Sequence, residues 1–205
     1  MEKSRLFADR NCLVLGAAHP VGQALCLRLA AQGGFVVALD ADETPLQTLA
    51  ARHPRRIAPL AMALSDTSGL QRLTASWARD PLHGVFLAHP LHDDLRLEDG
   101  LSSVAHVAQR LASVLATAGG AAVMLFADGS ETPQPRAAAR AYATLTETLA
   151  EAGVPINALA LHPPALQPAA QPRVCQVALM MALPMAHPVR GAVMPVGRRG
   201  SRGFD

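Results

Sequence analysis

The sequence predicts an α/β fold: one doubly wound domain with a mainly parallel sheet of about seven strands and helices on both faces. Short, almost continuous apolar runs alternate with helical patterns along the whole chain. Such alternation is typical of parallel strands joined by crossover helices. The apolar runs are bounded by Gly, Pro, Asp or His, as expected for strands that are buried on both faces.

The predicted elements follow one another with little space between them. The strands are expected at 12–15, 35–39, 57–64, 85–88, 121–126, 156–161 and 192–196, and the helices at 21–32, 45–52, 68–78, 101–116, 136–152 and 173–183. Thr44 is the expected cap of the second helix, with Pro45 at its first position, and Asp66 or Thr67 is the expected cap of the third. Residues 128–135 and 162–172 are expected to be loops at strand ends.

Composition limits the function classes. The chain has 205 residues, half of them apolar and 17% charged, so it predicts one globular domain over 1–205 with a flexible tail at 198–205. A net charge of +2 is too small to indicate nucleic-acid binding. Three cysteines in apolar surroundings suggest core residues in a reducing compartment. No apolar run is long enough to span a membrane, so a cytoplasmic location is expected.

The turn from Gly16 to Gly22 is the most informative motif. It connects an apolar strand to a helix, and Asp40 follows at the end of the next strand. This order predicts a dinucleotide-binding unit, in which the helix N-terminus binds pyrophosphate and the acid binds ribose. Pro20 weakens the prediction because proline offers no N–H and fills space beside the turn. Packing glycines and an ordinary strand-end aspartate are the alternative interpretations.

Several motifs together resemble the short-chain dehydrogenase/reductase family, from about residue 11 to 197. Gly16 and Gly22 match the first and last glycine of its Gly-x-x-x-Gly-x-Gly turn, and Pro20 replaces the middle one. Ala88 and its neighbours occupy the place of the family's Asn-Ala-Gly. The resemblance implies a Rossmann-type fold and a nicotinamide cofactor bound by Gly16, Ala18, His19, Pro20, Val21, Gly22, Asp40, Ser65, Asp66 and Ala88. NAD is favoured over NADP because no arginine follows Asp40.

The catalytic residues of that family are missing. Its chemistry rests on a Tyr-x-x-x-Lys pair with a serine and an asparagine, but this chain has one lysine, Lys3, before the first strand. Its one tyrosine, Tyr142, lies several residues beyond the expected place, where Arg136 and Arg140 stand instead. Ser130 is the one serine near the expected loop.

Two functions therefore stay open. One is a non-catalytic protein, either dinucleotide-sensing or structural, that acts through protein partners. The other is a divergent NAD-dependent oxidoreductase for a small carbonyl or alcohol, with His89, Ser130 or Tyr142 as candidate catalytic residues. His19, His89 and His92 are expected at the ligand edge of the sheet, but their spacing does not indicate a metal site.

The resemblance also implies self-association through the alanine-rich helix at 136–152. In the resembled family this helix builds a dimer interface, and its small side chains would let a second helix approach closely. A homo-oligomer is therefore expected.

Overall fold

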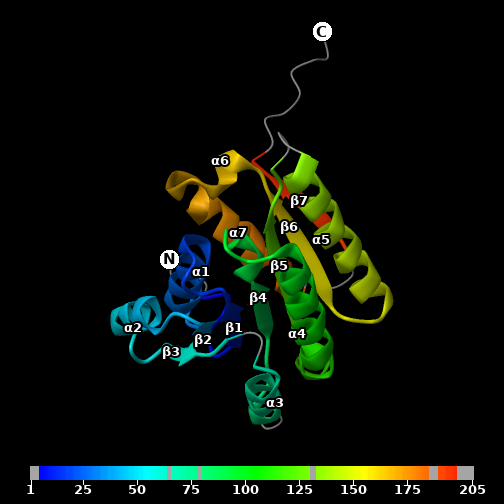
Figure 1. The fold of residues 1–205 in the computed structure, drawn as a ribbon. Coiled ribbons are helices and arrows are strands. Elements are labelled where there is room, and N and C mark those ends of the chain that lie inside the picture. The colour runs from blue at the N-terminus through cyan, green and yellow to red at the C-terminus, as the bar shows by residue number, and fades with distance from the viewer. Residues whose placement is uncertain (1–4, 64–65, 78–79, 130–132, 185–188, 198–205) are drawn as a thin grey trace.

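The computed structural model describes residues 5–63, 66–77, 80–129, 133–184 and 189–197, and within them the predicted α/β fold is confirmed (Figure 1). All strand pairs are parallel, in the order β3-β2-β1-β4-β5-β6-β7. The strands are β1 Asn11–Leu15, β2 Phe35–Asp40, β3 Ile57–Ala61, β4 Gly84–Leu87, β5 Ala121–Ala127, β6 Ile156–Leu161 and β7 Val193–Val196.

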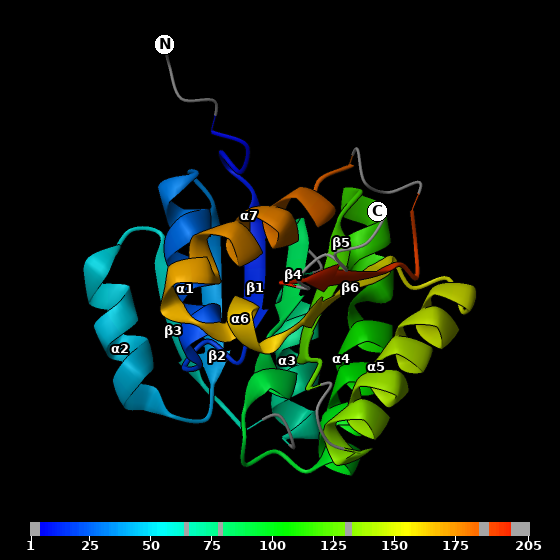
Figure 2. The same cartoon turned by 90° about the horizontal axis from the view of Figure 1, so that it is seen from above.

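Helices cover both faces of the sheet (Figures 1 and 2). One face carries α1 Pro20–Ala31, α2 Glu43–Arg52, α6 Pro163–Leu166 and α7 Gln171–Met181. The other carries α3 Thr67–Ser76, α4 Leu97–Ala118 and α5 Pro133–Glu151. Two short 3₁₀ turns, η1 His89–Leu91 and η2 Pro168–Ala170, complete the described elements.

The core consists of two apolar layers separated by the sheet. In β1, Cys12 and Val14 point into the α1 layer, whereas Leu13 and Leu15 point into the α4 layer. This period of two follows from the pleat of a strand. Each fully buried aliphatic side chain contributes roughly 1.5–3 kcal/mol, so a strand that is apolar on both faces is fixed strongly in the middle of the molecule.

Several local predictions were wrong. The loop expected at 128–135 overlaps α5, which begins at Pro133. Helix α2 begins at Glu43 rather than at Pro45, because the carboxylate of Asp42, not Thr44, caps it by accepting the Thr44 N–H at 3.1 Å. Pro45 is tolerated there since the first turn of a helix has no intrahelical use for its N–H groups. Residues 162–172 are not a plain loop, because they contain α6 and η2. The predicted tail at 198–205 lies outside the described residues.

Two glycines allow the turn before α1 to pack tightly. Gly16 has a φ of 78°, and a Cβ there would collide with the backbone nitrogen of His89. A Cβ on Gly22 would collide with the carbonyl oxygen of Gly16. Both glycines are therefore required by the packing of β1, η1 and α1, whether or not a ligand binds.

The substitution Gly16→Ala should lower the free energy of unfolding by about 2–4 kcal/mol, because strain at positive φ adds to a backbone collision. Gly153→Ala is the matched control, since Gly153 has a φ of 87° but open space around its Cα. The control should lose only about 1 kcal/mol. Urea denaturation of both variants measures the difference, and equal losses would contradict the packing argument.

Candidate functional site

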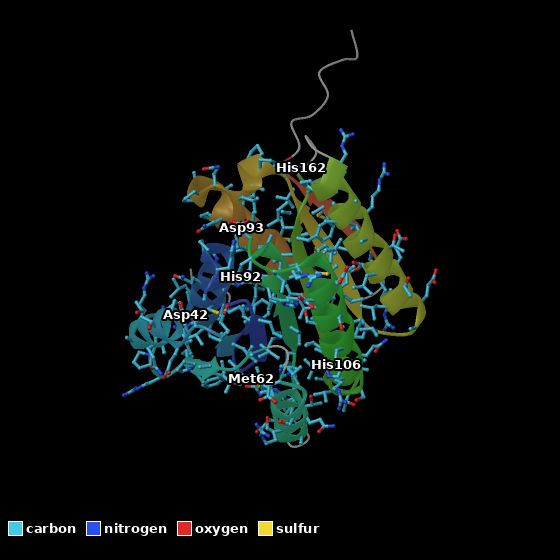
Figure 3. The ribbon with its side chains drawn as sticks, in the orientation of Figure 1. Asp42, Met62, His92, Asp93, His106 and His162 are labelled. Carbon is cyan, nitrogen blue, oxygen red and sulfur yellow. The ribbon has the colours of Figure 1, made fainter. Side chains whose placement is uncertain are left out.

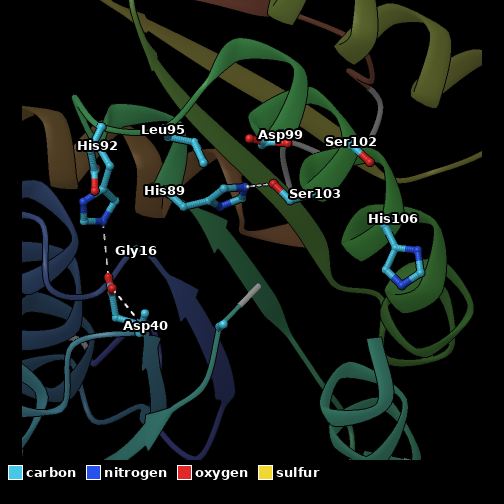
Figure 4. Close-up of a pocket in the computed structure, with 12 residues that line it drawn as sticks. Gly16, Asp40, His89, His92, Leu95, Asp99, Ser102, Ser103 and His106 are labelled. Atoms are coloured by element: carbon cyan, nitrogen blue, oxygen red, sulfur yellow. Dashed lines mark hydrogen bonds and ion pairs between the residues drawn. The ribbon is translucent and has the colours of Figure 1, made fainter. Parts of the chain in front are cut away.

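A cleft lies at the carboxyl edge of the sheet, where β1 separates β2 from β4. This is the point at which chain connections leave in opposite directions, and open α/β sheets bind their ligands there. The cleft has a volume of about 530 Å³ (Figure 4). Its walls come from the glycine turn, the end of β2, the segment after β4 and α4, and they are formed by Gly16, Asp40, Ala41, Ala63, His89, His92, Asp94, Leu95, Asp99, Ser102, Ser103 and His106.

Asp40, at the end of β2, contacts both the glycine turn and the segment after β4. Its Oδ2 accepts the backbone N–H of Ala18 at 2.9 Å. The same oxygen lies 3.2 Å from Nε2 of His92 (Figure 4). Its Oδ1 accepts the N–H of Ala41 at 2.8 Å. The carboxylate predicted to bind ribose is thus engaged with the turn and with a histidine of the opposite wall.

The other N–H groups of the turn are also used within the protein. Gly16 and Ala17 both donate to the carbonyl of Leu39, at 3.0 and 3.2 Å, and the His19 N–H donates to the Gly16 carbonyl. These contacts fix the turn against β2.

His19 caps α1 with its side chain. Nδ1 of His19 accepts the N–H of Val21 at 3.2 Å, and Pro20 stands at the first helical position with no N–H to offer. A pyrophosphate at a helix N-terminus needs such N–H groups free. From Gly16 to Val21 none of them is free, so the arrangement does not fit a dinucleotide pyrophosphate.

Asp40 and His92 shift each other's pKa. Burial alone would raise the pKa of Asp40, but hydrogen bonds from His92 and Ala18 outweigh it and hold that pKa below its usual value. The hydrogen bond to Asp40 raises the pKa of His92 above its usual value, against the effect of burial. The ring of His19 meets that of His92 edge to face, with 5.5 Å between ring centroids. Burial lowers the pKa of His19, and His92 lowers it further.

His89 is a neutral histidine in the inner wall. It is 1% exposed, and burial lowers its pKa to about 3. Its Nε2 lies 2.9 Å from the hydroxyl of Ser103, which donates to the carbonyl of Gly100 at 3.0 Å. We assign the Nε2–H tautomer to His89, because only in this form are both contacts made: Nε2–H donates to the Ser103 hydroxyl oxygen while the hydroxyl proton is donated to the Gly100 carbonyl. Nδ1 is then an acceptor, buried without a hydrogen-bond partner among the described residues.

Tyr142 does not line this cleft. It is 6% exposed, stacks on Phe126 with ring centroids 5.6 Å apart, and its hydroxyl packs against Gly100 of α4. Burial raises its pKa. Its position is that of a residue that packs α4 against α5.

The remaining predicted residues are scattered. Asp66 is the cap of α3, where it accepts the Gly69 N–H at 2.9 Å, and it is not part of the cleft wall. Ala88 is buried and donates its N–H to Leu15. Ser65 and Ser130 lie outside the described residues.

A second cavity, of about 370 Å³, lies beside α5, and Asp128, Arg136 and Arg140 are among its lining residues. Next to it, Nε2 of the buried His162 lies 3.4 Å from a carboxylate oxygen of Asp128. Figure 3 shows His162 well apart from His92. The two cavities share no lining residue.

The α4 wall was missed by the sequence interpretation. Asp99, Ser102, Ser103 and His106 line the cleft. The two serines follow Asp99 by three and four residues and precede His106 by four and three, which places all four on one helix face. A search for polar residues at helical spacing on 97–118 could have found them.

No group of three or more His, Cys, Asp and Glu among the described residues could hold a metal ion. None of the helices in the described ranges is both long and apolar enough to cross a membrane.

Comparison with known proteins gives the fold. No family model and no curated protein matches the sequence. One similar solved structure is a citronellol catabolism dehydrogenase of Pseudomonas aeruginosa PAO1, with a TM-score of 0.76, 19% sequence identity and 96% of each chain covered. Levodione reductase has a TM-score of 0.73 and 18% identity, with 93% of this chain and 96% of that chain covered. A protein described as a short-chain alcohol dehydrogenase of Sinorhizobium meliloti 1021 has a TM-score of 0.74 and 20% identity, with 94% of this chain and 96% of that chain covered. This chain has their fold over nearly its whole length, which confirms the predicted short-chain dehydrogenase-like, Rossmann-type architecture.

The Asp40–His92 pair should make stability depend on pH. Because the folded pKa of His92 is raised, its contribution is fully present below the unfolded pKa and is lost as pH rises through the folded value. Asp40, whose folded pKa is lowered, stays ionised throughout that range. The side chains are 28% and 12% exposed, so screening is partial.

The substitution His92→Gln should therefore cost roughly 0.5–1 kcal/mol of unfolding free energy at about pH 5.5 and clearly less at about pH 9. Urea denaturation at both pH values measures this. In an Asp40→Asn background, the pH-dependent part of the free-energy cost of His92→Gln should vanish. A cost that is the same at both pH values would show that the ion pair contributes nothing.

Proposed function

We propose that this protein is a non-catalytic relative of the short-chain dehydrogenases and reductases, a structural or partner-binding protein that does not transfer hydride. One observation carries the proposal: the cradle in which the fold would bind pyrophosphate is closed by the protein's own Asp40 and His19 side chains.

The position of Tyr142 supports the absence of catalysis. A catalytic tyrosine must present its hydroxyl to substrate, whereas this hydroxyl packs against Gly100 in the core between α4 and α5. The chain's single lysine, Lys3, precedes β1 and lies outside the described residues, and no other lysine exists to lower a tyrosine pKa. Among the described residues, no tyrosine paired with a lysine is therefore available near the cleft.

His89 is a poor substitute for the missing acid. At neutral pH a histidine whose pKa is about 3 holds no proton beyond the one that it donates to Ser103. An efficient general acid or base needs a pKa near the working pH. These properties weigh against the alternative function, an NAD-dependent oxidoreductase that uses His89.

The named neighbours are dehydrogenases and a reductase, so nicotinamide dinucleotides are the first ligands to test. We expect no binding of NADH or NADPH up to about 1 mM by calorimetry or nucleotide fluorescence, because pyrophosphate finds no free N–H group from Gly16 to Val21. Added aldehydes and ketones should produce no change in NADH absorbance.

The variant Asp40→Ala tests whether any binding uses the predicted ribose contact. Its matched control is Asp42→Asn, which removes a neighbouring charge but keeps an Asn cap on α2. NADH binding that Asp40→Ala abolishes and Asp42→Asn preserves, without turnover, would replace the structural role by dinucleotide sensing. Turnover with NADH would overturn the proposal.

We also propose that the protein self-associates through α5. The outward residues Ala137, Arg140, Thr144 and Thr148 of this helix are exposed in the single chain. Light scattering after size exclusion should give a dimer or larger assembly, and Ala137→Glu should shift it toward monomer because a buried charge is costly. The control Gln176→Glu, at an exposed position on α7 across the sheet, should leave the mass unchanged. A monomeric wild type would rule out this interface.

A further inference from the structure

We infer that the cleft beside Asp40 binds a small organic cation, an aliphatic amine or diamine, in place of a dinucleotide. The inference rests on the proposed function, since it assigns a ligand class to the cleft that pyrophosphate does not fit. It is carried by the charge of the walls and by a buried acceptor without a partner.

The walls are acidic. Three carboxylates, Asp40, Asp94 and Asp99, line the cleft, and no lysine or arginine is among its lining residues. Asp94 and Asp99 are exposed at the rim, on the segment after β4 and on the first turn of α4. His92 also lines the cleft and is paired with Asp40, so Asp94 and Asp99 are the carboxylates left to raise the local concentration of cationic ligands. The cleft repels phosphates and attracts ammonium groups.

One acceptor atom in the inner wall of the cleft, Nδ1 of His89, lacks a hydrogen-bond donor among the described residues. This atom is buried, and it is an acceptor because Nε2–H is committed to Ser103. A buried polar atom without a partner is energetically costly. An ammonium group offers three donors and no acceptor, so an amine that reaches this wall satisfies Nδ1, whereas a carboxylate or phosphate oxygen cannot.

The cleft has room for such a ligand and a short apolar surface for its chain. Its volume of about 530 Å³ falls in the range of small-molecule sites. Leu95 and the two alanines Ala41 and Ala63 supply apolar wall between the polar groups. Carboxylates at the rim and an acceptor at the inner wall match a molecule with an amine at each end and methylenes between them.

Putrescine, 1,4-diaminobutane, is the probe. Calorimetric titration of the full chain should show saturable binding, and succinate, a dianion of similar length, should show none. The double variant Asp94→Asn/Asp99→Asn should weaken putrescine binding about tenfold, because two attractive charges are removed without loss of volume. In ¹⁵N NMR spectra, the Nδ1 resonance of His89 should shift on addition of putrescine.

Glu98→Gln is the matched control. Glu98 lies on the same turn of α4, but its carboxylate faces Arg96 at 3.4 Å and does not line the cleft. This variant should bind putrescine like the wild type. Absence of saturable binding, equal weakening by both sets of variants, or a His89 signal that does not move would each overturn the inference.

A parallel NADH titration separates the two proposals. If neither NADH nor putrescine binds, the ligand class is wrong while the non-catalytic function stands. If NADH binds and is turned over, the proposed function itself fails, whatever putrescine does.

Discussion

The carboxylate of Asp40 is the constraint on which the rest of the site depends. One side chain at the end of β2 holds the Ala18 N–H of the glycine turn and faces His92 across the cleft. The contact fixes the turn and the histidine segment after β4 in a single arrangement. The same oxygens cannot accept hydrogen bonds from ribose hydroxyls without losing contacts to Ala18 or His92. Internal hydrogen bonds of the protein therefore compete with the ligand that the fold would otherwise bind.

The glycine turn is explained by packing. Gly16 has to be glycine because the backbone of His89 lies where its Cβ would be, and Gly22 because the Gly16 carbonyl does. The glycine signature is therefore not by itself evidence that the turn binds phosphate. Fold and activity are therefore separate questions. The chain has the architecture of the dehydrogenases, and our proposal that it does not share their chemistry rests on the arrangement of Asp40, His19, Pro20 and Tyr142.

Local patterns were sufficient to predict the fold, because apolar strands and helix periods depend on neighbouring residues. They were insufficient for the site. His92 and Asp40 are 52 positions apart, and nothing in their spacing indicates that they pair. The inward direction of the Tyr142 hydroxyl depends on Gly100 of another helix. The start of α2 was misplaced because Asp42 competed with Thr44 as the cap, a choice that only the backbone geometry decides.

The closure of the turn is tested most directly by amide hydrogen exchange and ¹H–¹⁵N NMR of Ala18 and Val21. Because both N–H groups donate to side chains within the protein, we predict slow exchange in the free protein and no shift of either signal on addition of NADH. Rapid exchange at both amides, with signals that move on titration with NADH, would contradict the account by showing a turn that is open and available to pyrophosphate.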